Sequence, residues 1–350
     1  MSPDIKTTLR EFKERLEPQI EAFFAEVRKG MEESDPFMIE AVGAMEDIVM
    51  AGGKRLRATL MYHAYLANGG TDKEAILRAT VSVELIHAFL LVHDDIIDRD
   101  GLRHGVPTLH ARYTDRARQL FPDKDAPHFG NSIAIILGDM LHAFGNDVIF
   151  RAHFPQDRIF AALTCLQRIV ASTVTGQARD IYIEYQGKAT EAEILSMYEN
   201  KTARYSIEGP LHLGTLLAGD NHELMTLFTE YALPLGIAYQ IQDDIIGIFG
   251  DEKSIGKPVG SDIEEGKYTL LVSKAIELAT KEQAAQIQEI LHKGRELTAH
   301  DIEKFKELLI ETGALESVRT IARQATEESL AVLPKLEEMI VPEAFDFLRG

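Results

Sequence analysis

Apolar side chains recur along most of this 350-residue chain at intervals of three and four residues, the spacing that places them on one face of an α-helix. Alternating apolar and polar residues, which predict strands, are nearly absent. We therefore predict an all-α protein whose residues 1–350 form a single helical domain, although the pattern alone also permits two helical halves. The predicted helices cover residues 5–27, 37–50, 75–93, 133–149, 158–185, 224–248, 269–279, 301–312 and 315–333.

Glycines and small polar residues predict where several helices begin and end. Helices commonly stop where glycine follows the apolar pattern, and they commonly begin at a side chain that can accept a hydrogen bond from the first turn. The expected stops are 68–70 and 218–220, and the expected N-caps are Thr71, Asp157 and Thr190, the last in a capping box with Glu193.

Two stretches interrupt the helical pattern. Residues 114–130 contain Pro122, Pro127 and several charges, and residues 251–266 are rich in Gly and Lys. Both stretches are therefore predicted to be irregular surface loops.

Composition narrows the possible functions. The formal net charge of −19 argues against nucleic-acid binding and suggests that anionic substrates are captured by local basic clusters. No run of about 18 apolar residues occurs, so no membrane insertion is expected. Residues 1–28 carry charges of both signs and no apolar signal segment. Cys165 is the only cysteine, which excludes an internal disulfide and fits a cytoplasmic protein.

Two aspartate pairs lie in apolar helical stretches about 150 residues apart, and their surroundings nearly repeat. The first stretch, 91–98, reads Leu-Val-His-Asp-Asp-Ile-Ile-Asp, and the second, 240–246, reads Gln-Ile-Gln-Asp-Asp-Ile-Ile. Carboxylates are costly to bury unless something positive compensates them. A buried salt bridge explains one such pair but poorly explains both. Oxygen-only clusters suit Mg²⁺ shared with substrate phosphates, so the sequence predicts a diphosphate held between two acidic helices.

Helical geometry separates the carboxylates of the first motif. Asp94 and Asp98 are four residues apart and share one face, about 40° apart around the helix axis. Asp95 points about 100° away and is expected to be a partial or supporting ligand. A solvated acidic patch is the alternative, but the neighbouring residues are too apolar for plain surface.

Basic residues accompany both acidic motifs. The segment Gly52-Gly53-Lys54-Arg55-Leu56-Arg57 puts a glycine turn before a helix start, where backbone N–H groups favour anions. Lys54 and Arg57 are three residues apart and can converge on one phosphate, although a solvated basic turn is the alternative. A diphosphate cluster needs a cationic rim, for which the candidates are Arg103, Lys201 and Lys257.

Together these motifs resemble those of the trans-isoprenyl diphosphate synthases, the family that makes farnesyl and geranylgeranyl diphosphates. The resemblance covers about residues 40–275. Besides the basic turn and both acidic pairs, it is carried by 102–105 (Leu-Arg-His-Gly), Gly138-Asp139, Gly176-Gln177 with Asp180, Lys201-Thr202-Ala203, Gln240, and 256–262 (Gly-Lys-Pro-Val-Gly-Ser-Asp). It implies a single all-α bundle around a deep central cavity, usually a homodimer.

The resemblance also implies a role for each matching residue. Three Mg²⁺ ions would be held by aspartates of the two motifs, namely Asp94, Asp95, Asp98, Asp243 and Asp244. The allylic diphosphate would be bound by Arg103, Lys201 and Lys257, and Lys267 would be a further substrate-binding residue. Isopentenyl diphosphate would be bound by Lys54, Arg57, His87 and His104. The catalytic residues would be Lys201, Thr202, Gln177 and Gln240, of which the last three would line the reacting centre and stabilise cationic charge through their oxygens.

In the reaction that the resemblance implies, diphosphate departs from the allylic substrate and leaves a carbocation. The double bond of isopentenyl diphosphate attacks it, and a proton is lost to the released diphosphate. No side-chain nucleophile is required, so His93 is expected to have a core or supporting role. Two alternatives share this fold: a terpene cyclase or head-to-head condensing enzyme, which lacks the basic turn, and a non-catalytic partner subunit, which has lost one acidic motif.

Two residues depart from the family pattern, and one aromatic residue bears on the expected length of the product. The family usually has a second arginine where this chain has His104, and a third aspartate where it has Gly247. Leu90 lies on the helical stripe of Asp94, whereas Phe89 lies about 140° round from it. In the family, the residue five before the first aspartate is the usual floor for the growing product. An aromatic there indicates a short product, so we expect geranylgeranyl (C20) diphosphate, with farnesyl (C15) as the alternative.

Overall fold

The computed structural model describes residues 4–31, 35–250 and 260–349, with the side chains of Ser261 and Arg295 outside that description. Within these ranges the chain is helical apart from turns and one pair of two-residue strands, which confirms the predicted all-α class. The chain divides into two compact units. The first unit comprises 1–166, 210–221 and 340–350, and the second comprises 167–209 and 222–339. The single-domain expectation stays a prediction.

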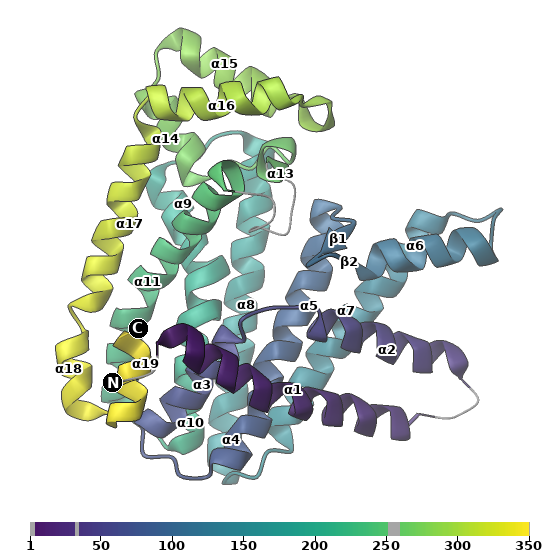
Figure 1. Cartoon of the computed structure of the whole chain (residues 1–350), viewed down its shortest axis with the longest axis vertical. Coiled ribbons are helices and arrows are strands. Elements are labelled where there is room, and N and C mark those ends of the chain that lie inside the picture. Colours follow the sequence, from purple (N-terminus) through teal and green to yellow (C-terminus); the bar gives the residue numbers. More distant parts are fainter. Residues whose placement is uncertain (1–3, 32–34, 251–259, 350) are drawn as a thin grey trace. The chain divides into compact units, whose positions relative to one another are not determined.

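The first unit contains most of the N-terminal half of the chain (Figure 1). Its elements are α1 (Ile5–Lys29), α2 (Pro36–Met50), α3 (Leu56–Ala67), α4 (Lys73–Ala79), α5 (Val81–Asp98), β1 (Leu102–Arg103), β2 (Val106–Pro107), α6 (Leu109–Leu120), α7 (Ala126–Phe150), α10 (Gly209–Ala218, from its second residue) and α19 (Pro342–Arg349). Helix α8 (Gln156–Gln186) begins in this unit and continues into the second.

The second unit holds the remaining elements, which include one π-helix and one short 3₁₀ turn. They are α9 (Glu191–Tyr198), η1 (Glu199–Glu208), α11 (His222–Phe249), α13 (Ser261–Glu264), α14 (Leu270–Leu278), α15 (Lys281–Leu291), η2 (Gly294–Glu296), α16 (Ala299–Glu311), α17 (Ala314–Leu330) and α18 (Leu333–Met339).

The core of the first unit forms where α5 lies along α7 and α7 lies along α6 (Figure 1). Leu85 and Ile86 of α5 are fully buried, and each such side chain contributes about 1.5–3 kcal/mol by leaving water. Ser82 donates a hydrogen bond of 2.6 Å to the carbonyl of Gly145 on α7. A Cβ at Gly145 would lie 2.8 Å from Ile86, so this glycine allows the two helices to approach. The first acidic motif therefore stands at the end of a well-anchored helix.

The core of the second unit is built around α11, which packs against α17 and η1. Ile241, Ile245 and Ile248 of α11 are buried at three- and four-residue spacing in one hydrophobic cluster. This buried stripe runs through the second acidic motif. It places Asp244 at the edge of the core and leaves Asp243 exposed.

Several predicted helix ends are confirmed. Helix α3 ends at Ala67 with Asn68 as its C-cap, and α10 ends at Ala218. Thr190 and Glu193 form the predicted capping box at the start of α9. These helix ends could be predicted from the sequence because glycine stops and capping boxes act through local hydrogen bonds.

Two predicted N-caps are wrong. The cap of α4 is Asp72 and not Thr71, because the Asp72 carboxylate accepts the hydrogen bond from the backbone N–H of Ala75. Asp157 lies inside the first turn of α8, which begins one residue earlier. The first prediction missed the cap position by one residue and the second by two.

The prediction of a loop over 114–130 is also wrong. Helix α6 continues to Leu120, and α7 begins at Ala126. The Asp125 side chain caps α7 by accepting from the backbone N–H of His128, and Pro127 occupies the first turn. Proline is tolerated there because first-turn N–H groups have no partner within the helix. Of the second predicted loop, residues 251–259 lie outside the described residues, and α13 occupies 261–264.

Three helical segments are long and apolar enough, by length and composition, to cross a membrane. They are Lys73–Asp98, Ala126–Phe150 and Gln156–Gln186. The sequence criterion of an uninterrupted apolar run was therefore too strict. In the first segment 78% of the most apolar window is buried inside the protein, compared with 33% in each of the others. The core thus accounts for the hydropathy of the first segment, and the expectation of no membrane insertion stays a prediction.

His63 gives the first unit a predictable dependence of stability on pH. Its ring stacks on Phe347 at 4.3 Å between ring centroids, and burial lowers its pKa to about 4. Since the unfolded chain takes up this proton near pH 6.5, the native state loses stability as the pH falls from about 6.5 to 4, by up to about 3 kcal/mol. We expect His63→Phe to keep the ring stacking and to lose less stability over that range, as measured by urea unfolding at several pH values.

The matched control is His300→Phe, which changes an exposed histidine of α16. It should leave the pH dependence of the free energy of unfolding as it is in the parent protein. A parent-like slope in His63→Phe would show that this histidine does not contribute.

Candidate functional site

The first acidic motif occupies the last turn of α5. Asp94 and Asp98 are partly exposed, whereas Asp95 is 1% exposed. The helix ends immediately afterwards at Arg99, which has a left-handed backbone conformation (φ 59°). The structure thus separates the three carboxylates as their helical angles predict, with Asp95 turned into the protein.

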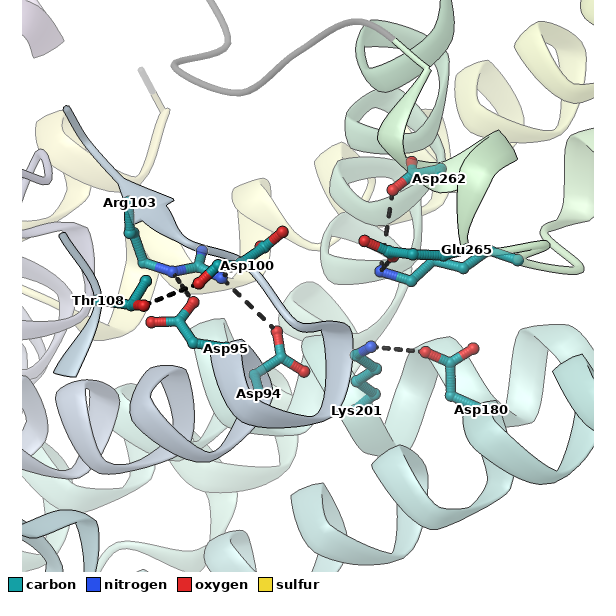
Figure 2. Close-up of polar contacts among 10 residues, drawn as sticks. Asp94, Asp95, Asp100, Arg103, Thr108, Asp180, Lys201, Asp262 and Glu265 are labelled. Carbon is teal, nitrogen blue, oxygen red and sulfur yellow. Dashed lines mark hydrogen bonds and ion pairs between the residues drawn. The ribbon is translucent and has the colours of Figure 1, made fainter. Parts of the chain in front are cut away.

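Arg103 balances the charge of this motif (Figure 2). Its Nε donates to Oδ1 of Asp95, and its terminal nitrogen lies 3.4 Å from Asp100 and 4.0 Å from Asp94. Burial raises the pKa of Asp95 to about 6, although the positive charge of Arg103 acts in the opposite direction. A ligand that reaches Asp94 would also come within reach of this guanidinium.

A tight hairpin holds Arg103 in place. Strand β1 pairs with β2 so that Arg103 faces Val106. The two connecting residues, His104 and Gly105, both have positive φ (51° and 79°), as a two-residue type I′ hairpin turn requires. The Thr108 hydroxyl donates to the carbonyl of Asp100 at 2.8 Å and closes the base of the hairpin (Figure 2).

The hairpin tip lies against the predicted basic turn in the same unit. A Cβ at Gly52 would lie 2.9 Å from the ring of His104, so the imidazole packs on a glycine. Arg57 approaches Nε2 of His87 at 3.4 Å. Burial and the positive charges of Arg57 and Arg103 lower the pKa of His87 well below its usual value. The structure therefore gathers Arg57, His87 and His104 from three separate segments.

The other basic residues of this turn have different environments. Lys54 is exposed and precedes the first residue of α3. Arg55 is buried and forms a 2.9 Å ion pair with Glu84, so it serves the core of the unit. The predicted choice of Lys54 and Arg57 as ligand-binding residues, without Arg55, fits this division.

Phe89 lies between α5 and α7. It is 8% exposed, and its ring centroid lies 4.9 Å from that of His93 and 5.0 Å from that of His142. His93 contacts the carbonyl of Ile135 at 3.2 Å, and its ring occupies the space that a side chain at Gly138 would need. His93 therefore has the packing role that was predicted. Leu90, by comparison, is only partly buried.

In the second unit, Lys201 and Thr202 lie in a π-helix of ten residues, η1. Such helices are rare and occur frequently at functional sites. A Cβ at Gly176 of α8 would lie 2.4 Å from the backbone nitrogen of Lys201, and a Cβ at Gly236 of α11 would lie 2.4 Å from Cα of Ala203. Glycines on two neighbouring helices thus make room for the wider π-helical backbone.

The predicted catalytic residues meet around this π-helix. The Lys201 ammonium lies 2.6 Å from Asp180 of α8 (Figure 2). The Thr202 hydroxyl donates to Oε1 of Gln240 at 2.6 Å. Gln177, on α8, is partly buried beside Gly176. The second unit therefore holds Lys201 in an ion pair and Thr202 in a hydrogen bond at consecutive positions of η1.

The second acidic pair divides in the same way as the first. Asp243 is exposed, and Asp244 is 7% exposed. Oδ2 of Asp244 accepts from the Tyr198 hydroxyl, and Oδ1 accepts from Nε2 of Gln240 at 2.8 Å. Burial raises the pKa of Asp244 to about 8, while these two hydrogen bonds act to lower it. A carboxylate so engaged fits poorly with the metal-ligand role predicted for Asp244.

At the departure from the family pattern, Gly247, the neighbouring space is taken by Asp262. A Cβ there would lie 2.7 Å from Oδ2 of Asp262, which already places a carboxylate beside this turn of α11. Lys267 lies 3.8 Å from Asp262 and 2.6 Å from Glu265 (Figure 2). The predicted ligand-binding Lys257 lies outside the described residues.

Metal binding would depend on oxygen donors from the ligand as well as the protein. Among residues 4–31, 35–250 and 260–349, no group of three or more His, Cys, Asp or Glu side chains is close enough to hold an ion. The exposed or partly exposed candidates, Asp94, Asp98 and Asp243, are all carboxylates. Mg²⁺ is commonly held by one or two carboxylates together with substrate phosphates, so this donor set fits magnesium.

A cavity of about 840 Å³ opens elsewhere in the first unit. Side chains of α1 and α7, such as Phe23 and Phe144, form much of its wall. It contains none of the predicted site residues, so we do not assign the site to it.

Sequence reasoning missed three residues that hold the site together, namely Asp180, Tyr198 and Asp262. Asp180 and Asp262 belong to motifs that the resemblance uses, but their contacts with Lys201 and Gly247 depend on packing between helices. Tyr198 lies in no such motif. Only its position three residues before Lys201 could have drawn attention to it.

Comparisons with known proteins agree with these motifs. A family model described as "Polyprenyl synthetase" matches residues 40–309. A geranylgeranyl diphosphate synthase of Saccharolobus solfataricus is 37% identical over 262 residues, which cover 74% of this chain and 73% of the relative. A geranylfarnesyl diphosphate synthase of Aeropyrum pernix is 32% identical over 298 residues, which cover 84% and 87%.

A solved structure extends the similarity to the fold. The crystal structure of a geranylgeranyl pyrophosphate synthase from Corynebacterium glutamicum, complexed with isoprenyl diphosphate and magnesium, matches with a TM-score of 0.91 and 32% identity. The match covers 97% of each chain.

The glycine contacts of η1 generate a prediction about stability. We expect Gly176→Ala to lower the free energy of unfolding by about 1–3 kcal/mol, because the added methyl group would collide with the backbone of Lys201. Gly43→Ala in α2 is the matched control, since a Cβ there would meet nothing within 4 Å. It should be neutral or stabilising by up to about 1 kcal/mol. Urea unfolding of both variants tests this account, which equal effects would contradict.

Proposed function

The chain belongs to the polyprenyl synthetase family and is a prenyltransferase, and on that premise we propose that it condenses isopentenyl diphosphate with an allylic diphosphate. The product would be a short-chain all-trans prenyl diphosphate, geranylgeranyl diphosphate (C20). The observation that carries the proposal is the arrangement around η1, where Lys201 is paired with Asp180 and the next residue, Thr202, is hydrogen-bonded to Gln240. That combination suits the departure of an anionic leaving group and the stabilisation of a cationic carbon.

The proposed reaction uses electrostatics and positioning. As the allylic C–O bond breaks, its electron pair leaves with diphosphate, whose charge Lys201 and Arg103 would help to balance. The oxygens of Thr202 and Gln240 would stabilise the resulting allylic carbocation. The double bond of isopentenyl diphosphate then forms the new C–C bond, and loss of a proton to the released diphosphate restores a double bond.

The first unit would hold the second substrate. The diphosphate of isopentenyl diphosphate would be bound by two cations, Lys54 and Arg57, together with the imidazoles of His87 and His104. His104 occupies the position of an arginine in the family, and a neutral imidazole binds phosphate less strongly than guanidinium.

We propose that three Mg²⁺ ions take part, held by Asp94 and Asp98 in the first unit and by Asp243 in the second, each together with substrate phosphates. When bound, Mg²⁺ neutralises charge on the departing diphosphate. The solved relative from Corynebacterium glutamicum contains both isoprenyl diphosphate and magnesium, which supports this cofactor. The structure describes each unit by itself, so the sharing of one diphosphate between the two motifs stays a prediction.

The C20 product rests on Phe89. Its ring is buried beside α7, one turn or more below Asp94 on α5, where bulk would stop a growing chain. Geranylgeranyl diphosphate synthases are among the relatives, and so are geranylfarnesyl diphosphate synthases. Farnesyl diphosphate (C15) remains the alternative product.

We also propose that the protein functions as a homodimer in the cytoplasm. Ile135, Ile136 and Phe150 of α7 are between 46% and 62% exposed, and such a face is what a second copy would cover.

Turnover in the presence of Mg²⁺ tests the proposed function. The parent protein, given isopentenyl diphosphate and dimethylallyl diphosphate, should yield a C20 product by mass. Asp94→Ala and Asp243→Ala should each reduce the rate by orders of magnitude while keeping the helical content measured by circular dichroism. Neither aspartate is buried in the core, so the helices that carry them should stay folded.

The matched control for this experiment is Asp123→Ala, which changes an exposed aspartate between α6 and α7. It should retain the parent rate. Near-normal turnover by both Asp94→Ala and Asp243→Ala would remove the proposed metal role.

Product length tests the role of Phe89. We expect Phe89→Ala to open an apolar space of ring size that a longer prenyl chain can fill, so that products lengthen to C25 or beyond with the rate largely kept. Phe121→Ala, which changes a phenylalanine that is 45% exposed, should leave the products unchanged. An active Phe89→Ala variant that still makes the parent product would show that Phe89 is not the floor.

A further inference from the structure

Four hydrogen bonds in the second unit connect one backbone amide to Thr202. The N–H of Leu270 donates to the Tyr198 oxygen at 2.9 Å, and the Tyr198 hydroxyl donates to Oδ2 of Asp244. Gln240 donates through Nε2 to Oδ1 of Asp244 at 2.8 Å, and Thr202 donates to Oε1 of Gln240 at 2.6 Å. The chain of bonds passes through α14, α9, α11 and η1.

The chemistry of these groups sets the direction of every bond. A backbone N–H can only donate, so it occupies an acceptor site on Tyr198, whose own proton is directed to Asp244. In its ionised form Asp244 can only accept, and the two hydrogen bonds donated to it favour that form. Gln240 then presents its NH₂ group to Asp244 and its carbonyl oxygen to Thr202. Thr202 must then donate its proton to Gln240. With its proton donated to Gln240, the Thr202 hydroxyl can present only its oxygen lone pairs to a ligand.

Burial keeps this direction from being reversed by water. Tyr198 is 3% exposed and Asp244 is 7% exposed. Leu270 is the first residue of α14, where an N–H has no partner within its own helix. Burial also holds the pKa of Tyr198 well above its usual value, so the phenol keeps its proton. A fully satisfied buried network of this kind is rigid.

We propose that Tyr198 and Asp244 are positioning residues, which fix the orientation of Gln240 and so turn the oxygen lone pairs of Thr202 toward the positive charge that develops on the allylic carbon. The inference rests on the proposed function and deepens it. It gives the buried aspartate of the second motif a task different from metal binding, which is left to its exposed neighbour Asp243.

Asp244→Asn tests the direction of the bonds without changing the size of the side chain. If the new carboxamide accepts from Tyr198, it must present its NH₂ group to Gln240. Gln240 must then turn over and present its own NH₂ group to Thr202, whose proton would be directed toward the developing cation. We expect kcat to fall about 100-fold, the lower end of the effect of removing one stabilising group from such a site. The KM values for both diphosphates and the Mg²⁺ dependence should stay those of the parent.

A second substitution should restore the direction. In the double variant Asp244→Asn/Gln240→Glu, the new carboxylate can accept from both the carboxamide and Thr202. Thr202 again donates inward, and we expect kcat to recover at least about tenfold over Asp244→Asn. Gln240→Glu alone would place two carboxylates beside each other, and we expect its kcat to be lower than that of the parent. A merely structural role for Asp244 would not make the double variant better than either single variant.

Asp301→Asn is the control for loss of stability alone. Asp301 is a buried carboxylate in the capping box of α16, in the same unit, and takes no part in the chain of bonds. This variant should keep the parent kcat even if it unfolds more easily.

Unfolding measurements test the chain of bonds without any substrate. The double variant Tyr198→Phe/Asp244→Asn should change the free energy of unfolding by an amount that differs from the sum of the two single changes, because both substitutions disrupt the same bond. Additive losses would overturn the network on which the proposal stands.

The kinetic outcomes separate this proposal from the function it builds on. A parent protein without turnover would overturn the proposed function, and the catalytic use of this network with it. An active parent with an unchanged kcat in Asp244→Asn would overturn the positioning role alone. So would a kcat in that variant that returns to the parent value at high Mg²⁺, because that result would identify Asp244 as a metal ligand.

Discussion

The cost of burying a carboxylate governs the organisation of both acidic motifs. Each motif places two adjacent aspartates on an apolar helix, where consecutive side chains point about 100° apart. One of the two is therefore turned toward the core and must be compensated. Asp95 is compensated by Arg103, and Asp244 is compensated by Tyr198 and Gln240. What remains for a ligand is the exposed or partly exposed member of each pair.

Close helix packing supplies the second constraint. The π-helix η1 needs more room than an α-helix, and Gly176 and Gly236 provide it on two sides. Lys201 and Thr202 are thereby fixed on rigid backbone. The same principle operates in the first unit, where Gly52 accommodates the ring of His104 and Gly138 that of His93. Glycines that look like flexible points in the sequence are positions of contact in the structure.

Most of the fold could be predicted because helix periodicity and capping are local. Helices α1, which begins at Ile5, and α11, which ends at Phe249, both follow the apolar pattern. The capping box of Thr190 also lies where it was expected. The loop predicted around Pro127 failed because proline both breaks helices and begins them, and the sequence does not distinguish the two. The π-helix was not predicted. Its hydrogen bonds join residues five apart in place of four, and this difference leaves little trace in the spacing of apolar residues.

The candidate site was predictable only in part for a similar reason. Spacing along one helix separated Asp95 from Asp94 and Asp98, and the resemblance supplied roles for the cations. The partners Tyr198, Asp180 and Asp262 reach the site from other helices, and no local rule assigns such contacts. The closeness of Asp262 to Gly247 likewise appears only in the structure.

The central claim is that each acidic pair contains one buried structural aspartate and one that can bind metal. A crystal structure of the protein with Mg²⁺ and a diphosphate substrate would test it most directly. We predict Mg²⁺–oxygen distances of about 2.1 Å from Asp94, Asp98 and Asp243, with Asp95 still on Arg103 and Asp244 still on Tyr198 and Gln240. Direct coordination of Mg²⁺ by Asp95 or Asp244, with loss of those hydrogen bonds, would contradict it.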